Sequence, residues 1–193
     1  VPVHVFGQPI DHQALDAVAQ EFALPVLTDA TESLGSTWRG RPAGSYGLLS
    51  VLSFNGNKIV TTGGGGAIVT DDDGLAKTVR HVCTTAKQPH KWAFNHDRPA
   101  FNYRLPNLNA AVGCAQMERL DQFVTEKRQL AATYRKCLAS IAGIEVMQDP
   151  PGSESNYWLV AMKLDAGLKQ QRDEILDTLH AAGLKCRPLW TPM

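Results

Sequence analysis

Short apolar runs alternate with helical patterns along the first part of the sequence. The runs Val26–Asp29, Leu48–Phe54 and Ala67–Thr70 have the length and composition of buried strands. Asp11 can cap a helix that continues to Phe22, with apolar residues recurring on one face. Strand–helix alternation is typical of α/β proteins with a mainly parallel sheet, and this is the fold class that we expect.

The rest of the sequence predicts a long loop and a smaller α+β unit. Residues 84–104 are polar and aromatic, as in loops that are functional or disordered. The further strands expected are Val1–Phe6, Ile144–Val146, Asn156–Lys163 and Leu184–Arg187. The further helices expected are one that follows the turn Asp71–Gly74 and reaches about His81, one capped by Asn107, and those at Asp121–Ser140 and Lys169–Ala182.

Composition excludes several classes of function. The chain has 193 residues, of which 44% are hydrophobic, enough for a sizeable core. Its formal net charge is zero and it has no basic block, which argues against nucleic acid or an anionic membrane as a partner. No apolar run is long enough to span a bilayer. The 4 cysteines lack paired spacing, so we expect reduced thiols in a cytoplasmic protein and no metal site.

One lysine is placed where it could do chemistry. Lys58 follows the apolar strand Leu48–Phe54 and precedes the four-glycine turn Gly63–Gly66. A lysine among apolar strands ionises less readily and can attack a carbonyl as an amine nucleophile. The alternative, a solvated lysine at a strand end, remains open from this pattern alone.

An acid is predicted at the same edge of the sheet. Asp29 ends the strand Val26–Asp29, and open α/β sheets bind ligands at the carboxyl ends of their strands. A carboxylate and a lysine together meet the needs of pyridoxal phosphate (PLP): the acid keeps the pyridine nitrogen protonated and the amine forms the Schiff base. Asp29 could instead be a helix cap or a turn residue.

Several ordered blocks carry a family resemblance. They are Pro2–Gly7, Asp29–Gly35, Ser53–Lys58, Thr61–Gly66, Phe101–Asn107 and Arg187–Met193. With them the chain resembles the DegT-type sugar aminotransferases, which depend on PLP and have fold type I. The resemblance implies a partial PLP-binding large domain at 1–120 and a partial small C-terminal domain at 121–193.

The resemblance also implies roles for individual residues. Lys58 would bind PLP covalently and move the proton, and Asp29 would pair with the pyridinium nitrogen. Glu32 would lie near the ring and its 3-oxygen, Ser53 would bond the phosphate, and Asn102 would reach the phosphate in a partner subunit. Many relatives have Gln at the position of Glu32, so its carboxylate marks a subgroup.

The implied reaction moves an amino group from L-glutamate to a UDP-linked 4-keto-6-deoxy sugar, in a homodimer with shared active sites. The subgroup resembled acts on routes to bacillosamine and legionaminic acid. Because Val1 is not a start methionine, we expect an internal piece of a longer enzyme. Two alternatives remain: a PLP-dependent sugar dehydratase, in which His replaces the lysine of Lys58, and a truncated, non-catalytic chain that acts as a structural or interaction module.

Overall fold

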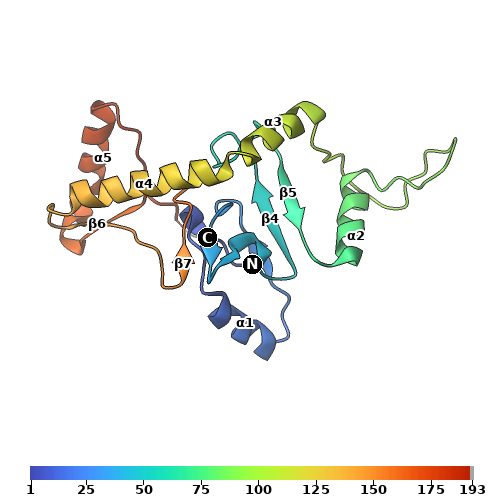
Figure 1. The fold of residues 1–193 in the computed structure, drawn as a ribbon, viewed down its shortest axis with the longest axis horizontal. Helices are drawn as coiled ribbons and strands as arrows, with labels where there is room; N and C mark the ends of the chain where they lie inside the picture. The colour runs from blue at the N-terminus through green and yellow to red at the C-terminus, as the bar shows by residue number, and fades with distance from the viewer. Residues whose placement is uncertain (192–193) are drawn as a thin grey trace. The chain divides into compact units, whose positions relative to one another are not determined.

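The fold was taken from a computed structural model, which describes residues 1–191 (Figure 1). The end of the last motif, Pro192–Met193, therefore lies outside the described residues. The helices are α1 (His12–Glu21), α2 (Asp73–Cys83), α3 (Asn107–Met117), α4 (Leu120–Leu138) and α5 (Arg172–Ala181). The strands are β1 (Leu27–Asp29), β2 (Thr37–Trp38), β3 (Arg41–Pro42), β4 (Leu49–Ser53), β5 (Gly66–Val69), β6 (Ile144–Val146), β7 (Ser153–Glu154) and β8 (Met162–Leu164).

The sheet that positions the candidate site has the order β1-β4-β5. β1 and β4 are parallel, with Asp29 opposite Val51, and Val3 adds a parallel bridge to Asp29. β5 is antiparallel to β4, because the connection between them contains no helix that could return the chain for a parallel strand. The predicted α/β fold class is confirmed, and β5 joins this sheet as an antiparallel strand.

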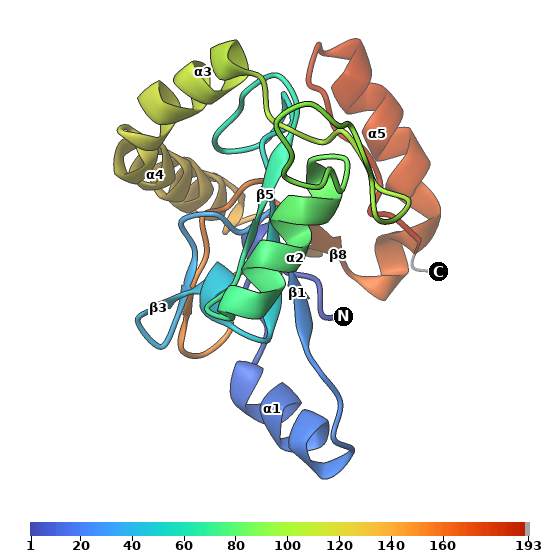
Figure 2. The ribbon, with the colours of Figure 1, turned by 90° about the vertical axis from the view of Figure 1, so that its right-hand side faces the viewer.

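Local capping explains where two helices begin. The Asp11 side chain accepts a hydrogen bond from Ala14 N at 3.1 Å, so it is the N-cap of α1, as predicted. Asp72 caps α2 in the same way, accepting from Leu75 N at 2.8 Å. Both views place α2 on the β5 side of the sheet (Figure 2). A second small sheet, with the order β3-β2-β7, brings residues 153–154 beside residues 37–38.

Three predicted strands are wrong. Val1–Phe6 forms only the bridge at Val3, because the backbone turns sharply at Phe6, whose φ is 59°. Asn156–Lys163 is extended only from Met162, since Tyr157 has a φ of 47° and breaks the strand pattern. Leu184–Arg187 pairs with no strand within residues 1–191. In the first two cases the local composition favoured a strand, and hydrogen bonds with the distant segment that carries Glu32 set another backbone path.

The chain divides into two compact units. Unit 1 contains Val1–Leu130 and Asp149–Leu159, and it holds both three-stranded sheets. Unit 2 contains Ala131–Gln148 and Val160–Met193, and it includes the antiparallel pair β6–β8 and helix α5. The predicted domain division at residue 120 remains a prediction. Within residues 1–191, no helix combines the length and the apolar content needed to cross a membrane.

Candidate active site

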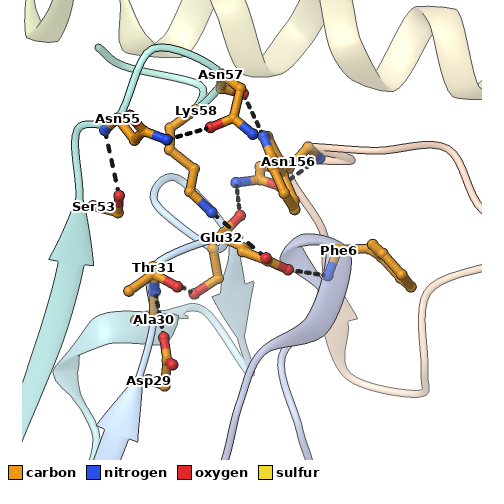
Figure 3. A network of polar contacts seen from close by, with 12 residues as sticks. Phe6, Asp29, Ala30, Thr31, Glu32, Ser53, Asn55, Asn57, Lys58 and Asn156 are labelled. Atoms are coloured by element: carbon orange, nitrogen blue, oxygen red, sulfur yellow. Dashed lines mark hydrogen bonds and ion pairs between the residues drawn. The ribbon is translucent and has the colours of Figure 1, made fainter. Parts of the chain in front are cut away.

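The parallel pairing of β1 and β4 brings their carboxyl ends to one edge of the sheet. Asp29 is the last residue of β1, Ser53 is the last residue of β4, and Lys58 follows in the turn after β4. Figure 3 shows the Lys58 side chain extending from this turn toward Glu32, with Asp29 and Ser53 on the neighbouring strands. The structure therefore gathers four of the five predicted site residues in one region of unit 1.

The Lys58 amine lies between a carboxylate and an aromatic ring. Its Nζ is 3.5 Å from Oε1 of Glu32 and 3.9 Å from the centroid of the Trp158 ring. The side chain is only 13% exposed, so the solvated-surface interpretation of this lysine does not hold. Both neighbours attract a positive charge, one by its own charge and the other by the electron-rich face of its ring.

Glu32 is held from both its side chain and its backbone. Its Oε2 accepts a hydrogen bond from the Phe6 backbone N–H at 2.7 Å, which the sharp turn at Phe6 aims toward it. Its backbone carbonyl accepts from Nδ2 of Asn156 at 2.8 Å. The carboxylate is thus fixed beside the Lys58 amine by two segments that are distant in sequence (Figure 3).

Asp29 has one oxygen engaged in a local turn. Its Oδ1 accepts from Thr31 N at 3.1 Å, the turn interaction that the alternative interpretation predicts. Its backbone is fixed by bonds from Asp29 N to Pro2 O at 2.9 Å and from His4 N to Asp29 O at 3.0 Å. Within residues 1–191, the structure gives no hydrogen bond to Oδ2 of Asp29, which leaves this oxygen able to accept one from a ligand.

The other two predicted residues differ in their surroundings. The Ser53 hydroxyl oxygen accepts from Asn55 N at 3.3 Å, at the same sheet edge as Lys58. Asn102 lies outside this network, in the irregular segment 84–104. It is exposed, its backbone forms a bridge with Thr84, and its Oδ1 accepts from Nε of Arg104 at 3.3 Å.

A buried histidine supports the Asp29 end of the site. His4 is fully buried, and its Nδ1 is 2.9 Å from the Ser33 hydroxyl oxygen. Burial, with the neighbouring His12, lowers the pKa of His4 to about 4, although Asp29 opposes the shift. His4 is therefore neutral near pH 7 and has a structural role beside Asp29.

Sequence reasoning missed the segment that completes the site. Asn156 and Trp158 were assigned to a strand, but both are buried against the turns that carry Glu32 and Lys58. The indole Nε1 of Trp158 donates to Asn57 O at 2.6 Å. The one available signal was the polar Asn156 at the start of the stretch expected to be a strand, followed by two large aromatic residues.

Comparisons with known proteins agree on one family. The model of the DegT/DnrJ/EryC1/StrS aminotransferase family matches residues 1–193. A GDP-perosamine synthase from Caulobacter vibrioides is 36% identical over 195 residues, which cover 100% of this chain and 52% of that protein. EpsN from Bacillus subtilis (strain 168), assigned as a pyridoxal phosphate-dependent aminotransferase, is 34% identical over 193 residues, covering 100% of this chain and 49% of EpsN.

Solved structures show the same fold. The crystal structure of DesI in the presence of its TDP-sugar product matches with a TM-score of 0.85 and 30% identity, covering 96% of this chain and 47% of DesI. PseC from Helicobacter pylori, at 22% identity, matches with a TM-score of 0.90 over 94% of this chain and 49% of PseC. The chain thus spans about half the length of the relatives that it matches.

Proposed function

Because this chain belongs to the DegT/DnrJ/EryC1/StrS aminotransferase family, we propose that it carries the catalytic lysine of a PLP-dependent aminotransferase that acts on nucleotide-linked ketosugars. The observation that supports this most is the largely enclosed Lys58 amine, located at the sheet edge where the Asp29 carboxylate ends the adjacent strand. An amine, an acid and a hydroxyl at one edge are the set of groups that PLP requires.

The residues present fit this cofactor. Lys58 has a nearly enclosed amine for the aldehyde carbon, and Asp29 has an oxygen with no hydrogen bond from residues 1–191 for the pyridinium N–H. The Ser53 hydroxyl accepts one bond from Asn55 N, so its proton is available for the phosphate. When bound, PLP supplies the electron sink that allows a proton to leave the carbon bearing the amine.

The chain's own residues would divide the work as follows. Lys58 Nζ is the group positioned to hold the cofactor and then to take up and return the proton. Glu32 Oε1, at 3.5 Å, forms an ion pair with that amine and keeps it from turning into solvent. Asp29 would keep the ring nitrogen protonated through an ion pair, and its fixed backbone maintains the direction of the carboxylate.

We assign L-glutamate as the amino donor and a UDP-linked 4-keto-6-deoxy sugar as the acceptor. The names of two relatives, a GDP-perosamine synthase and DesI with its TDP-sugar product, support a nucleotide-linked sugar, and the choice of UDP depends on the subgroup that the sequence resembles. We also propose a homodimer in which Asn102 of each copy reaches the cofactor phosphate of the other. The exposure of Asn102 supports this.

Trapping the cofactor tests the lysine directly. The protein is incubated with PLP, reduced with borohydride and digested, and the modified peptide is identified by mass spectrometry. We expect one dominant modification, at Lys58, and its loss in Lys58→Ala. Lys91→Ala is the matched control, because Lys91 also lies over a tryptophan ring but is exposed. Labelling spread over surface lysines would contradict the assignment and favour a non-catalytic module.

Substrate assays test the reaction class. Purified protein with PLP is supplied with L-glutamate and with UDP-, GDP- and TDP-linked 4-keto-6-deoxy sugars in parallel, and 2-oxoglutarate is measured. Turnover with UDP-sugars above the others supports the finer assignment. Turnover only with GDP- or TDP-sugars would support the aminotransferase assignment and contradict the assignment of a UDP-linked acceptor. Release of ammonia without an aminated sugar would indicate the dehydratase instead.

A further inference from the structure

Trp158 contacts both the lysine and the turn that carries it. The ring centroid is 3.9 Å from Lys58 Nζ, and the indole N–H donates to the carbonyl of Asn57, the residue before Lys58, at 2.6 Å. Trp158 is 4% exposed, so these contacts are made away from bulk water. A cation over an aromatic face gains most when both groups are desolvated.

The segment around Trp158 is itself fixed to the acid side of the site. Asn156 Nδ2 donates to the carbonyls of Glu32 at 2.8 Å and Leu34 at 2.9 Å. The Asn156 Oδ1 in turn accepts from Trp158 N at 2.8 Å. One short segment therefore sets the distance between the Glu32 carboxylate and the aromatic face that lies on the Lys58 amine.

We propose that Trp158 is a positioning residue for Lys58, an inference that rests on the proposed function. The indole face and the Glu32 carboxylate together form a cradle for the free ammonium, and the indole N–H fixes the backbone at the base of the lysine. Whenever Nζ carries no bond to a carbonyl, the cradle keeps the amine at the sheet edge next to Asp29. The amine therefore stays in position and does not have to return from solvent before it transfers the next proton.

Two properties of the cradle can be measured separately. The aromatic face holds the Lys58 amine in place, so its removal leaves the amine free of the ring, and open to reagents, for a larger share of the time. The indole N–H acts on the backbone and does not depend on the charge of Lys58. Trp158→Phe keeps a ring and loses the N–H, whereas Trp158→Leu loses both.

The first experiment reads the contact by NMR in cofactor-free protein with labelled lysine side chains. The Lys58 signal is assigned by its loss in Lys58→Arg. We expect the Lys58 side-chain protons of the wild type to be shifted upfield by the indole ring current, partly shifted in Trp158→Phe and unshifted in Trp158→Leu. Trp92→Leu is the control: it removes the exposed ring near Lys91 and should leave Lys58 unchanged.

The second experiment measures how fast formaldehyde and a mild reductant methylate Lys58 in the same proteins. The rate should rise about three- to thirtyfold in Trp158→Leu and return most of the way in Trp158→Phe, in keeping with the strength of a desolvated cation–ring contact. If the replacements only loosened the fold, Trp158→Leu and Trp158→Phe would raise the methylation rate of Lys58 by the same factor. That result overturns the proposal, and unshifted Lys58 protons in the wild type overturn it even if Trp158→Leu does not fold.

Neither the NMR shift nor the methylation rate depends on PLP or substrate. A failure of the aminotransferase assignment would therefore appear in the trapping assay and not in these two measurements. If trapping at Lys58 succeeds while the wild-type Lys58 protons are unshifted, the function holds and the cradle is wrong. If the shift is present and trapping fails, the contact holds, but it does not serve PLP chemistry, and the positioning role is refuted.

Discussion

At the scale of single residues, Gly7 shows how closely two distant segments approach at the site. Its φ is +87°, a region where side chains other than glycine are strained. Its carbonyl accepts from the Ser36 hydroxyl at 2.6 Å. A Cβ at Gly7 would overlap the Asn156 side chain, which holds the Glu32 carbonyl. The room beside Gly7 and the position of the Glu32 backbone thus both depend on the Asn156 side chain.

Gly7→Ala is therefore expected to destabilise the protein by more than its backbone strain alone. Strain at a positive φ costs about 1 kcal/mol, and forcing a methyl group into a filled space adds about 1–3 kcal/mol. Gly40→Ala is the matched control, because Gly40 has a φ of +76° and no heavy atom within 4 Å of the added Cβ. Urea unfolding measures both. Equal losses of stability would show that Asn156 yields easily.

The residues of the candidate site differ in how far sequence alone could find them. Lys58, Asp29 and Ser53 stand at or just after the ends of apolar runs, and strand direction fixes where those ends meet. Asn156 and Trp158 reach the site from about a hundred positions away, through a backbone turn at Tyr157 with a φ of 47°. No glycine marks that turn, so its conformation is set by packing, which local pattern does not encode.

At the scale of elements, α1 brings a second histidine into the core beside His4. His12 is the first residue of α1, and its ring stacks on Tyr46 with centroids 3.8 Å apart. The two histidine rings meet edge to face at 5.1 Å. Burial lowers the pKa of both, for His4 to about 4, because a charged ring would lose its hydration.

These lowered pKa values predict a loss of stability on acidification. The unfolded chain binds a proton at each histidine near pH 6.5, whereas folded His4 resists protonation down to about pH 4. Between these values the unfolded state holds more protons, so the free energy of unfolding falls as pH falls and is flat above the window. His4 alone contributes an upper limit of about 3 kcal/mol to this fall.

Urea unfolding at pH 7 and pH 5 measures the effect in the wild type and in His4→Asn. The asparagine Oδ1 can replace Nδ1 opposite the Ser33 hydroxyl, and it does not titrate in this range. Any cost of the smaller side chain is present at both pH values and cancels in the difference. We expect a smaller pH 7-to-5 loss in His4→Asn and an unchanged loss in His90→Asn, a control at an exposed loop histidine. The same loss in all three proteins would contradict the role of burial.

Elements with their own local signals were predicted well. α1 and α2 begin next to aspartates that cap them, and β4 lies within the mainly apolar run Leu48–Phe54. The antiparallel direction of β5 was not predicted, because only the absence of a crossover helix reveals it. The predicted strands at Val1–Phe6 and Asn156–Lys163 failed for a shared reason: their polar partners, Glu32 and Leu34 among them, lie far away in sequence.

At the scale of the whole molecule, burial is distributed unevenly between the two units. Unit 1 holds the buried aromatic residues Trp38, Tyr46 and Trp158. In the part of unit 2 that the structure describes, the buried apolar side chains are Ala131 and Val146. A two-stranded sheet with so little buried apolar surface is marginally stable in water. The stability of the site therefore depends on unit 1.

Amide hydrogen exchange should reveal this difference within a single helix. α4 runs from Leu120 to Leu138, and the boundary between the units falls after Leu130. Both halves have the same helical hydrogen bonding, so a difference in exchange reports how firmly each unit holds its half. We expect the second half of α4, with β6 and β8, to exchange at least about tenfold faster than the first half and β4, because opening of the weaker unit does not require global unfolding. Mass spectrometry of peptides from each half measures this. Uniform protection along α4 would mean that both units unfold together, and the site would then owe part of its stability to unit 2.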